Sequence, residues 1–150
     1  MTTDISTVNT ISHIIATSVA PVFLLAAVGA ILNVYSQRLA RVVDKYERIN
    51  NRLDKLGSDA EAKKEVLISR LKFYAKRVRI ISNAITFCTL TGLLISLVIV
   101  LLFSSMLFNF HTDKLISGLF IAAMFSLAFS LTLFLKEVLY ADKILDKMRI

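Results

Sequence analysis

The sequence contains few of the residues that end helices, build turns or cross-link chains. Its 150 residues include one cysteine, one proline and four glycines. One cysteine excludes a disulfide framework or a multi-cysteine metal site within a single chain. Soluble domains of this size rarely combine so little proline and glycine with 56% apolar residues. The composition therefore predicts an all-α integral membrane protein.

Charged residues are missing from three long windows of the chain. Residues 14–35, 80–108 and 115–135 contain no aspartate, glutamate, lysine or arginine. At ~1.5 Å per helical residue, each window can cross the ~30 Å hydrocarbon core of a bilayer. Residues 1–12 lack the basic start of a secretory signal peptide, so we expect the first window to be retained. We predict a single domain, residues 1–150, with three transmembrane helices.

The charges outside these windows predict the orientation of the chain. Residues 36–79 hold thirteen Lys or Arg against six Asp or Glu, and short basic loops stay on the cytoplasmic side of a membrane. The weakly charged N-terminus and the connection at 109–114 are expected outside, which places the C-terminus in the cytoplasm. The basic loop accounts for the net charge of +7 without any nucleic-acid recognition motif, so we expect no nucleic acid partner.

The cytoplasmic loop, residues 36–79, has the apolar rhythm of a helical hairpin. Apolar residues recur every three or four positions on both sides of Gly57, which precedes the helix-capping residues Ser58 and Asp59. The pattern predicts an antiparallel coiled coil in which positions whose numbers sum to about 116 lie opposite each other. The seam residues are Leu39, Val42, Tyr46, Ile49, Leu53 and Leu56, then Leu67, Leu71, Tyr74, Val78 and Ile81.

Another apolar stripe runs from the third window into the C-terminal segment 136–150. Leu127, Leu131, Phe134 and Val138 follow one another at helical spacing across this boundary. We therefore expect one continuous helix that leaves the membrane and docks on the cytoplasmic hairpin.

Basic residues cluster where the hairpin meets the membrane. Such residues attract anionic lipid headgroups, at about 1 kcal/mol per residue near the surface. The alternative is that they only set the topology of the chain. The candidates for anionic lipid contact are Arg38, Arg41, Lys72, Lys76, Arg77 and Arg79.

Two asparagines in the windows predict a polar contact between the first and second helices. In the proposed register Asn33 lies opposite Asn83, each about one turn inside the nearest arginine. Because an amide in hydrocarbon needs a hydrogen-bond partner, we expect the two to bond to each other. The alternative is that both side chains reach toward interfacial water.

Small residues recur every four or eight positions in the second and third windows. Faces of this kind let helix backbones approach closely in lipid. We expect the two faces to pack together within one chain, with Ser130 at the depth of Gly92, and the alternative is an interface between subunits. The residues are Gly92, Ser96, Ser104, Gly118, Ala122, Ser126 and Ser130.

The outer end of the first window is the most polar part of any window. Pro21 removes a helical hydrogen bond, and the hydroxyls of Thr17 and Ser18 can satisfy the freed carbonyl. One interpretation is that these three residues and His13 line a pore or cavity. The other is a kinked helix with a self-satisfied backbone and His13 at the outer interface.

Three runs of sequence carry a resemblance to a known family. They are APVFLLAAVGAILNVYSQRLARVVDKY, RVRIISNAITFCTLTGLLISLVIVLLF and LFLKEVLYA. Together they resemble a bacterial family of small three-span membrane proteins catalogued as a domain of unknown function. The most specific part joins Pro21, Asn33, Arg38, Leu39, Arg41 and Asp44. The resemblance implies a location in the bacterial inner membrane and brings no activity with it.

Two functional classes remain after these observations. Catalysis and ion-coupled transport need convergent titratable groups, and the windows contain no carboxylate, lysine or arginine, so we expect neither an enzyme nor a cofactor. The favoured interpretation is a homo-oligomeric interaction protein whose coiled-coil hairpin serves assembly or recruits a cytoplasmic protein partner. The alternative is a homo-oligomeric ion-conducting pore lined by the first transmembrane helix, which requires several chains around an axis.

Overall fold

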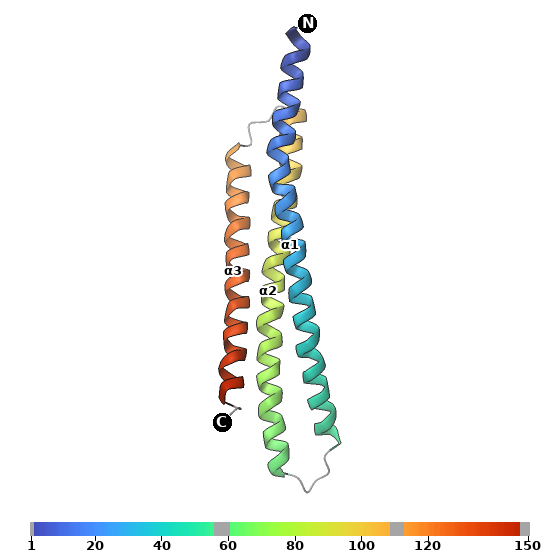
Figure 1. Ribbon diagram of the computed structural model, residues 1–150, viewed down its shortest axis with the longest axis vertical. Coiled ribbons are helices and arrows are strands. Elements are labelled where there is room, and N and C mark those ends of the chain that lie inside the picture. Colours follow the sequence, from blue (N-terminus) through green and yellow to red (C-terminus); the bar gives the residue numbers. More distant parts are fainter. Residues whose placement is uncertain (1, 56–60, 109–112, 148–150) are drawn as a thin grey trace. The chain divides into compact units, whose positions relative to one another are not determined.

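Long helices make up nearly all of the structure. The computed structural model describes residues 2–55, 61–108 and 113–147, together with the side chains of residues 19–55, 61, 63–105 and 113–139. Every described residue except Lys55 is helical. The helices are α1 (Thr2–Asp54), α2 (Glu61–Phe108) and α3 (Asp113–Lys147), as shown in Figure 1. The predicted all-α class is confirmed for the described residues.

Each helix is longer than a bilayer crossing requires. The three contain 53, 48 and 35 residues, whereas about 20 apolar residues suffice to cross hydrocarbon. The parts of the helices that are long and apolar enough to cross a membrane lie within Val19–Asp54, Lys63–Ser105 and Asp113–Leu139. The chain is therefore a multi-pass membrane protein, and α3 continues without a break from its predicted span to Lys147.

Two predictions concern the backbone, one at the hairpin connection and one at Pro21. The hairpin connection, with Gly57, Ser58 and Asp59, lies outside the described residues. Pro21 lies inside α1, and the helix runs through it without interruption. Because the side chain of Pro21 is buried, the ring occupies packed space rather than the lipid-facing side of the helix.

Contacts divide the chain into two compact units, and each unit takes segments from every described helix. The first unit comprises Met1–Ile31 and Cys88–Leu127. The second comprises Leu32–Phe87 and Ala128–Ile150. We describe each unit by itself.

The core of the first unit includes small and β-branched residues of α1 and α2. Val28 and Cys88 are fully buried, and the Cys88 thiol lies 3.9 Å from the backbone oxygen of Val28. This pair fits the antiparallel register predicted for α1 and α2, in which paired numbers sum to about 116. The remaining buried residues of this unit are Pro21, Thr91, Ile95, Val98 and Ala123.

In the second unit the amphipathic faces of α1 and α2 turn inward. All ten described residues of the predicted seam are buried or half-buried, and Leu56 lies outside the described residues. The burial confirms that these residues form the inner faces of their helices, while the coiled-coil geometry stays a prediction.

Aromatic side chains join α3 to the other helices of the second unit. Tyr35 of α1 stacks on Phe134 of α3 with ring centroids 4.4 Å apart. Phe87 of α2 meets Phe129 of α3 edge to face at 4.7 Å. Glu137 of α3 also contacts both other helices, as described below, and docking of the rest of the C-terminal segment stays a prediction.

Candidate functional site

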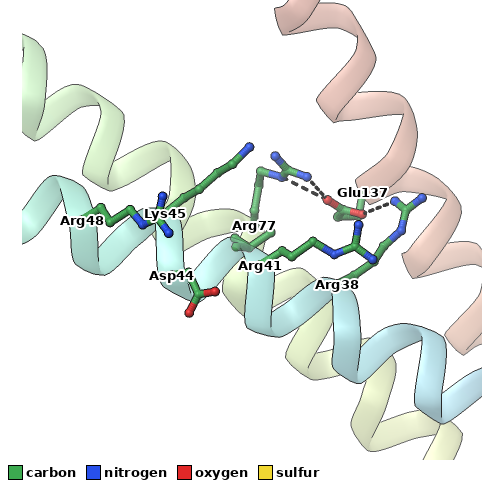
Figure 2. Close-up of a pocket in the computed structure, with 8 residues that line it drawn as sticks. Arg38, Arg41, Asp44, Lys45, Arg48, Arg77 and Glu137 are labelled. Atoms are coloured by element: carbon green, nitrogen blue, oxygen red, sulfur yellow. Dashed lines mark hydrogen bonds and ion pairs between the residues drawn. The ribbon is translucent and has the colours of Figure 1, made fainter.

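A buried carboxylate lies at the centre of the second unit. The side chain of Glu137 on α3 is 0% exposed, and it binds one arginine from each of the other two helices. Arg38 of α1 donates from Nη1 to Oε2 at 3.4 Å. Arg77 of α2 donates from Nε to Oε1 at 3.0 Å, and its Nη2 binds the same oxygen. We call these three residues the Glu137 triad; Figure 2 shows their hydrogen bonds.

Aromatic rings position both arginines of the Glu137 triad. The guanidinium carbon of Arg38 lies 4.9 Å from the ring centroid of Phe134, and that of Arg77 lies 5.8 Å from the ring of Phe73. A guanidinium over an aromatic face is attracted by the ring electrons while its edge remains able to donate hydrogen bonds. The rings therefore hold the donors in place on either side of the carboxylate.

The Glu137 triad connects all three helices by charge-assisted bonds. An ionised carboxylate removed from water is strongly destabilising unless its oxygens are paired, and here an arginine binds each oxygen of Glu137. Arg77 is only 16% exposed, whereas Arg38 is 40% exposed and retains access to solvent. The arrangement therefore fixes the orientation of α3 against both helical arms.

A pocket of about 340 Å³ opens beside the Glu137 triad. Its volume is at the lower end of the ~300–1,000 Å³ range of small-ligand sites. Side chains from all three helices line it, with six of the eight from α1 (Figure 2). The lining residues are Arg38, Arg41, Val42, Asp44, Lys45, Arg48, Arg77 and Glu137. Five of the lining side chains are cationic and two are anionic, so the pocket favours anions.

The side chains that line the pocket suit anions. Among the described residues, no three His, Cys, Asp or Glu side chains lie close enough to hold a metal ion. The cations of the pocket are arginines and lysine, which donate hydrogen bonds and cannot coordinate a metal in their charged form.

Of the six residues predicted to contact anionic lipid, two bind Glu137 and four are exposed. Arg38 and Arg77 bind Glu137, so their charges are partly neutralised within the protein. Arg41 is exposed and lines the pocket, and its Nε donates to the backbone oxygen of Gln37 at 3.4 Å. The other three, Lys72, Lys76 and Arg79, are exposed on α2.

The two asparagines predicted to pair are both exposed. Asn33 accepts a hydrogen bond at its Oδ1 from Nε2 of Gln37, one turn along α1, at 3.3 Å. The structure thus gives Asn33 a partner on its own helix, and the contact between Asn33 and Asn83 stays a prediction.

The structure gives the surroundings of the two glycines in the predicted small-residue faces. Gly92 faces α1, because a Cβ on it would lie 3.5 Å from Cγ1 of Val28 and 3.8 Å from Cδ1 of Leu25. A Cβ on Gly118 would meet no atom within 4 Å. Gly92 thus contacts α1, and the packing of the two small-residue faces against each other stays a prediction.

Ser130 of α3 binds the backbone of a small residue of α2. It is buried and donates from Oγ to the backbone oxygen of Ala84 at 2.7 Å, two turns along α2 from the predicted depth of Gly92. Of the remaining small residues, Ser96 and Ala122 are exposed, and Ser104 and Ser126 are half-buried.

Substitution of the two glycines tests this assignment. We expect Gly92→Ala to keep or raise the stability, by up to ~1 kcal/mol, because the new methyl group enters ordinary contact and alanine favours a helix. Gly92→Leu should lower it by about 1 to 3 kcal/mol through overpacking against Val28. Unfolding titrations in mixed micelles measure both. Gly118→Leu is the matched control and should be tolerated; a loss of stability in Gly92→Ala would contradict the assignment.

Three of the four residues in the pore interpretation have side chains that the structure does not describe. The side chains of His13, Thr17 and Ser18 lie outside the described residues. Pro21 is buried in the first unit. A pore lined by α1 therefore stays a prediction.

Sequence reasoning missed the residue on which the site depends. Residues 136–150 are predicted only to continue an apolar stripe, and Glu137 is assigned no role. Its spacing contained a signal, because Ser130, Phe134 and Glu137 lie three to four positions apart on the buried face of α3. A glutamate on an apolar stripe, level with the ends of two predicted spans that carry arginines, indicates a buried ion pair.

Comparison with known proteins gives a family without a described activity. No curated protein and no solved structure matches the chain. The model of a family described as "Protein of unknown function (DUF2721)" matches residues 18–147, a range that includes the whole Glu137 triad and the pocket. The resemblance noted in the sequence is thereby confirmed: the chain belongs to the DUF2721 family.

Proposed function

We propose that this protein is a non-enzymatic scaffold of the bacterial inner membrane that self-associates through its cytoplasmic hairpin. The N-terminus lies outside, and the C-terminus and residues 36–79 lie in the cytoplasm. The hairpin then serves as an assembly surface, for further copies or for a cytoplasmic protein partner. The single observation that carries this proposal is the Glu137 triad.

The position of the Glu137 triad supports a scaffold. Arg38 follows the predicted end of the first span, Arg77 precedes the second, and Glu137 follows the third. The buried ion pair therefore lies at the predicted junction between membrane and hairpin, and it connects α3 to both arms. A flexible tether needs no such connection, whereas a surface presented for assembly gains from a fixed orientation, because less conformational entropy is lost on binding.

Exposed apolar side chains on α2 support self-association. Val66 and Ile68 are 52% and 38% exposed, and both lie in the arm predicted to face water. A second copy of the hairpin would cover them. The exposed basic residues Lys72, Lys76 and Arg79 are nearer the predicted membrane boundary, where anionic headgroups would neutralise them.

One labelling experiment tests orientation and self-association together. In the full chain with Cys88→Ala, a single cysteine is introduced by Ser69→Cys, an exposed and nearly isosteric position beside Ile68. Membrane vesicles of both orientations are then treated with an impermeant maleimide or bis-maleimide. We expect labelling and cross-linked dimers in inverted vesicles only.

The matched control places the cysteine at the opposite, predicted outer side. Asp113→Cys in the same background is exposed at the start of α3 and should be labelled only in right-side-out vesicles. Labelling of Ser69→Cys from the outside would overturn the orientation. A monomeric mass in detergent, together with no cross-linked dimer, would overturn self-association.

A further inference from the structure

The basic pocket beside the Glu137 triad contains cations that form no ion pair with a described residue. Arg38 and Arg77 are bound to Glu137. Arg41, Lys45 and Arg48 remain, and the other carboxylate of the pocket is Asp44. In Figure 2 the carboxylate of Asp44 points to the opposite side of α1 from the ammonium of Lys45. The pocket therefore keeps an excess of positive charge after its internal ion pairs are counted.

Helical spacing places these three cations on one face of α1. Arg41, Lys45 and Arg48 are separated by four and then three positions, so their side chains share one side of the helix. Like charges at this spacing destabilise a helix by roughly 0.2 to 0.5 kcal/mol per pair. The side chains of Lys45 and Arg48 form no ion pair or hydrogen bond with a described residue. The side chain of Arg41 donates one hydrogen bond, from Nε to the backbone oxygen of Gln37. Most of their donors are free for a ligand.

We propose that this pocket binds a phosphate group through Arg41, Lys45 and Arg48. A phosphate has several acceptor oxygens and up to two negative charges, which suits two guanidinium groups and one ammonium better than a single carboxylate does. Glu137 occupies the donors of Arg77 and repels anions, so the phosphate binds on the α1 side of the pocket. The volume of about 340 Å³ holds a phosphate together with part of the group that carries it.

The phosphate can come from a lipid headgroup or from a soluble compound. Arg41 lies six residues beyond the predicted end of the first span, which is ~9 Å along a helix. Arg48 lies thirteen residues beyond the same point, at ~20 Å. A headgroup at the inner surface thus reaches Arg41 first, whereas a soluble phosphate reaches all three cations from the cytoplasm. This site differs from general attraction to lipid, because Lys45 and Arg48 lie beyond the basic residues nearest the membrane.

The test measures ligand-induced stabilisation of the full chain in an uncharged detergent. One arm adds short-chain phosphatidylglycerol, with phosphatidylcholine of equal chain length as its reference, a zwitterion with no net charge. The other adds inorganic pyrophosphate, with sulfate at equal ionic strength as its reference. Thermal unfolding is followed by circular dichroism, since a ligand of the folded state raises the unfolding temperature as its concentration exceeds Kd.

Two charge-matched variants distinguish the pocket from the overall charge of the chain. Lys45→Gln/Arg48→Gln removes two exposed pocket cations whose side chains form no hydrogen bond or ion pair with a described residue, so we expect the fold to be retained. Lys63→Gln/Lys64→Gln removes two exposed cations of α2 outside the pocket. We expect the first variant to need at least about tenfold more ligand for the same rise in unfolding temperature, because two charge-assisted contacts are lost. The second should behave as the unmodified chain.

Each outcome decides the proposal. A rise in the unmodified chain that is weakened only by Lys45→Gln/Arg48→Gln supports the site, and the arm that responds identifies lipid, soluble phosphate or both as the source. No rise in either arm, or equal weakening in both variants, overturns it. The test does not depend on self-association, so the scaffold and the phosphate site stand or fall separately.

Discussion

Glu137→Gln is expected to destabilise the protein by roughly 3 to 5 kcal/mol, the range found when one partner of a buried ion pair is removed. The amide keeps the shape of the side chain but removes the charge that neutralises Arg38 and Arg77. Arg77 is 16% exposed and is left as a cation with little access to water, whereas Arg38, at 40%, is partly solvated. We therefore expect a value toward the lower end of the range.

Cys88 provides the measurement for this variant. It is buried, so a thiol-reactive dye labels it only when the helices separate, and the rate of labelling along a denaturant titration reports unfolding. Glu65→Gln, which neutralises an exposed glutamate in the same unit, is the control and should change stability by less than about 0.5 kcal/mol. Equal stability of Glu137→Gln and the unmodified chain would show that the buried charge is not needed.

Tyr35→Ala is expected to cost about 3 kcal/mol, because it removes a buried ring that stacks on Phe134. Truncation of a large buried aromatic side chain in a soluble protein costs ~3 to 5 kcal/mol. Tyr35 lies at the predicted inner end of the first span, where the surroundings are partly lipid. Lipid reduces the hydrophobic part of the loss, while the lost contacts and the cavity remain. The effect should also extend to the Glu137 triad, since Phe134 positions Arg38.

The matched control for this truncation is the preceding residue of the same helix. Val34 is half exposed, so Val34→Ala removes apolar atoms without opening a cavity and should stay within about 0.5 kcal/mol of the unmodified chain. Unfolding titrations in mixed micelles measure both variants. If Tyr35→Ala were as stable as Val34→Ala, the stacked pair would carry no packing energy.

Helices and their inner faces could be predicted from the sequence because each depends on local pattern. The charge-free windows predicted three long apolar helices. The spacing of residues such as Val42 and Ile81 predicted the helix faces that are buried in the structure. The register of α1 against α2 was also predictable, as Val28 and Cys88 show, because the connecting hairpin is short and its seam is regular.

The packing of α3 could not be predicted in the same way. It depends on helix rotation and on side chains from distant parts of the chain, which spacing along one helix does not determine. Ser130 binds Ala84 rather than lying at the depth of Gly92, and Gly92 faces α1. Glu137 was missed for a related reason: a single glutamate is read as solvated unless its partners, 60 and 99 residues away, are known.

The late position of Glu137 in the chain has a consequence for biogenesis. The ribosome adds Arg38 and Arg77 well before it adds Glu137, whose carboxylate binds both arginines in the Glu137 triad. In the proposed orientation both arginines lie beside the inner leaflet, whose phospholipid headgroups are the nearest anions until then. We therefore expect the arrival of the last helix to release those lipids, with a carboxylate of the protein taking the place of a membrane counterion.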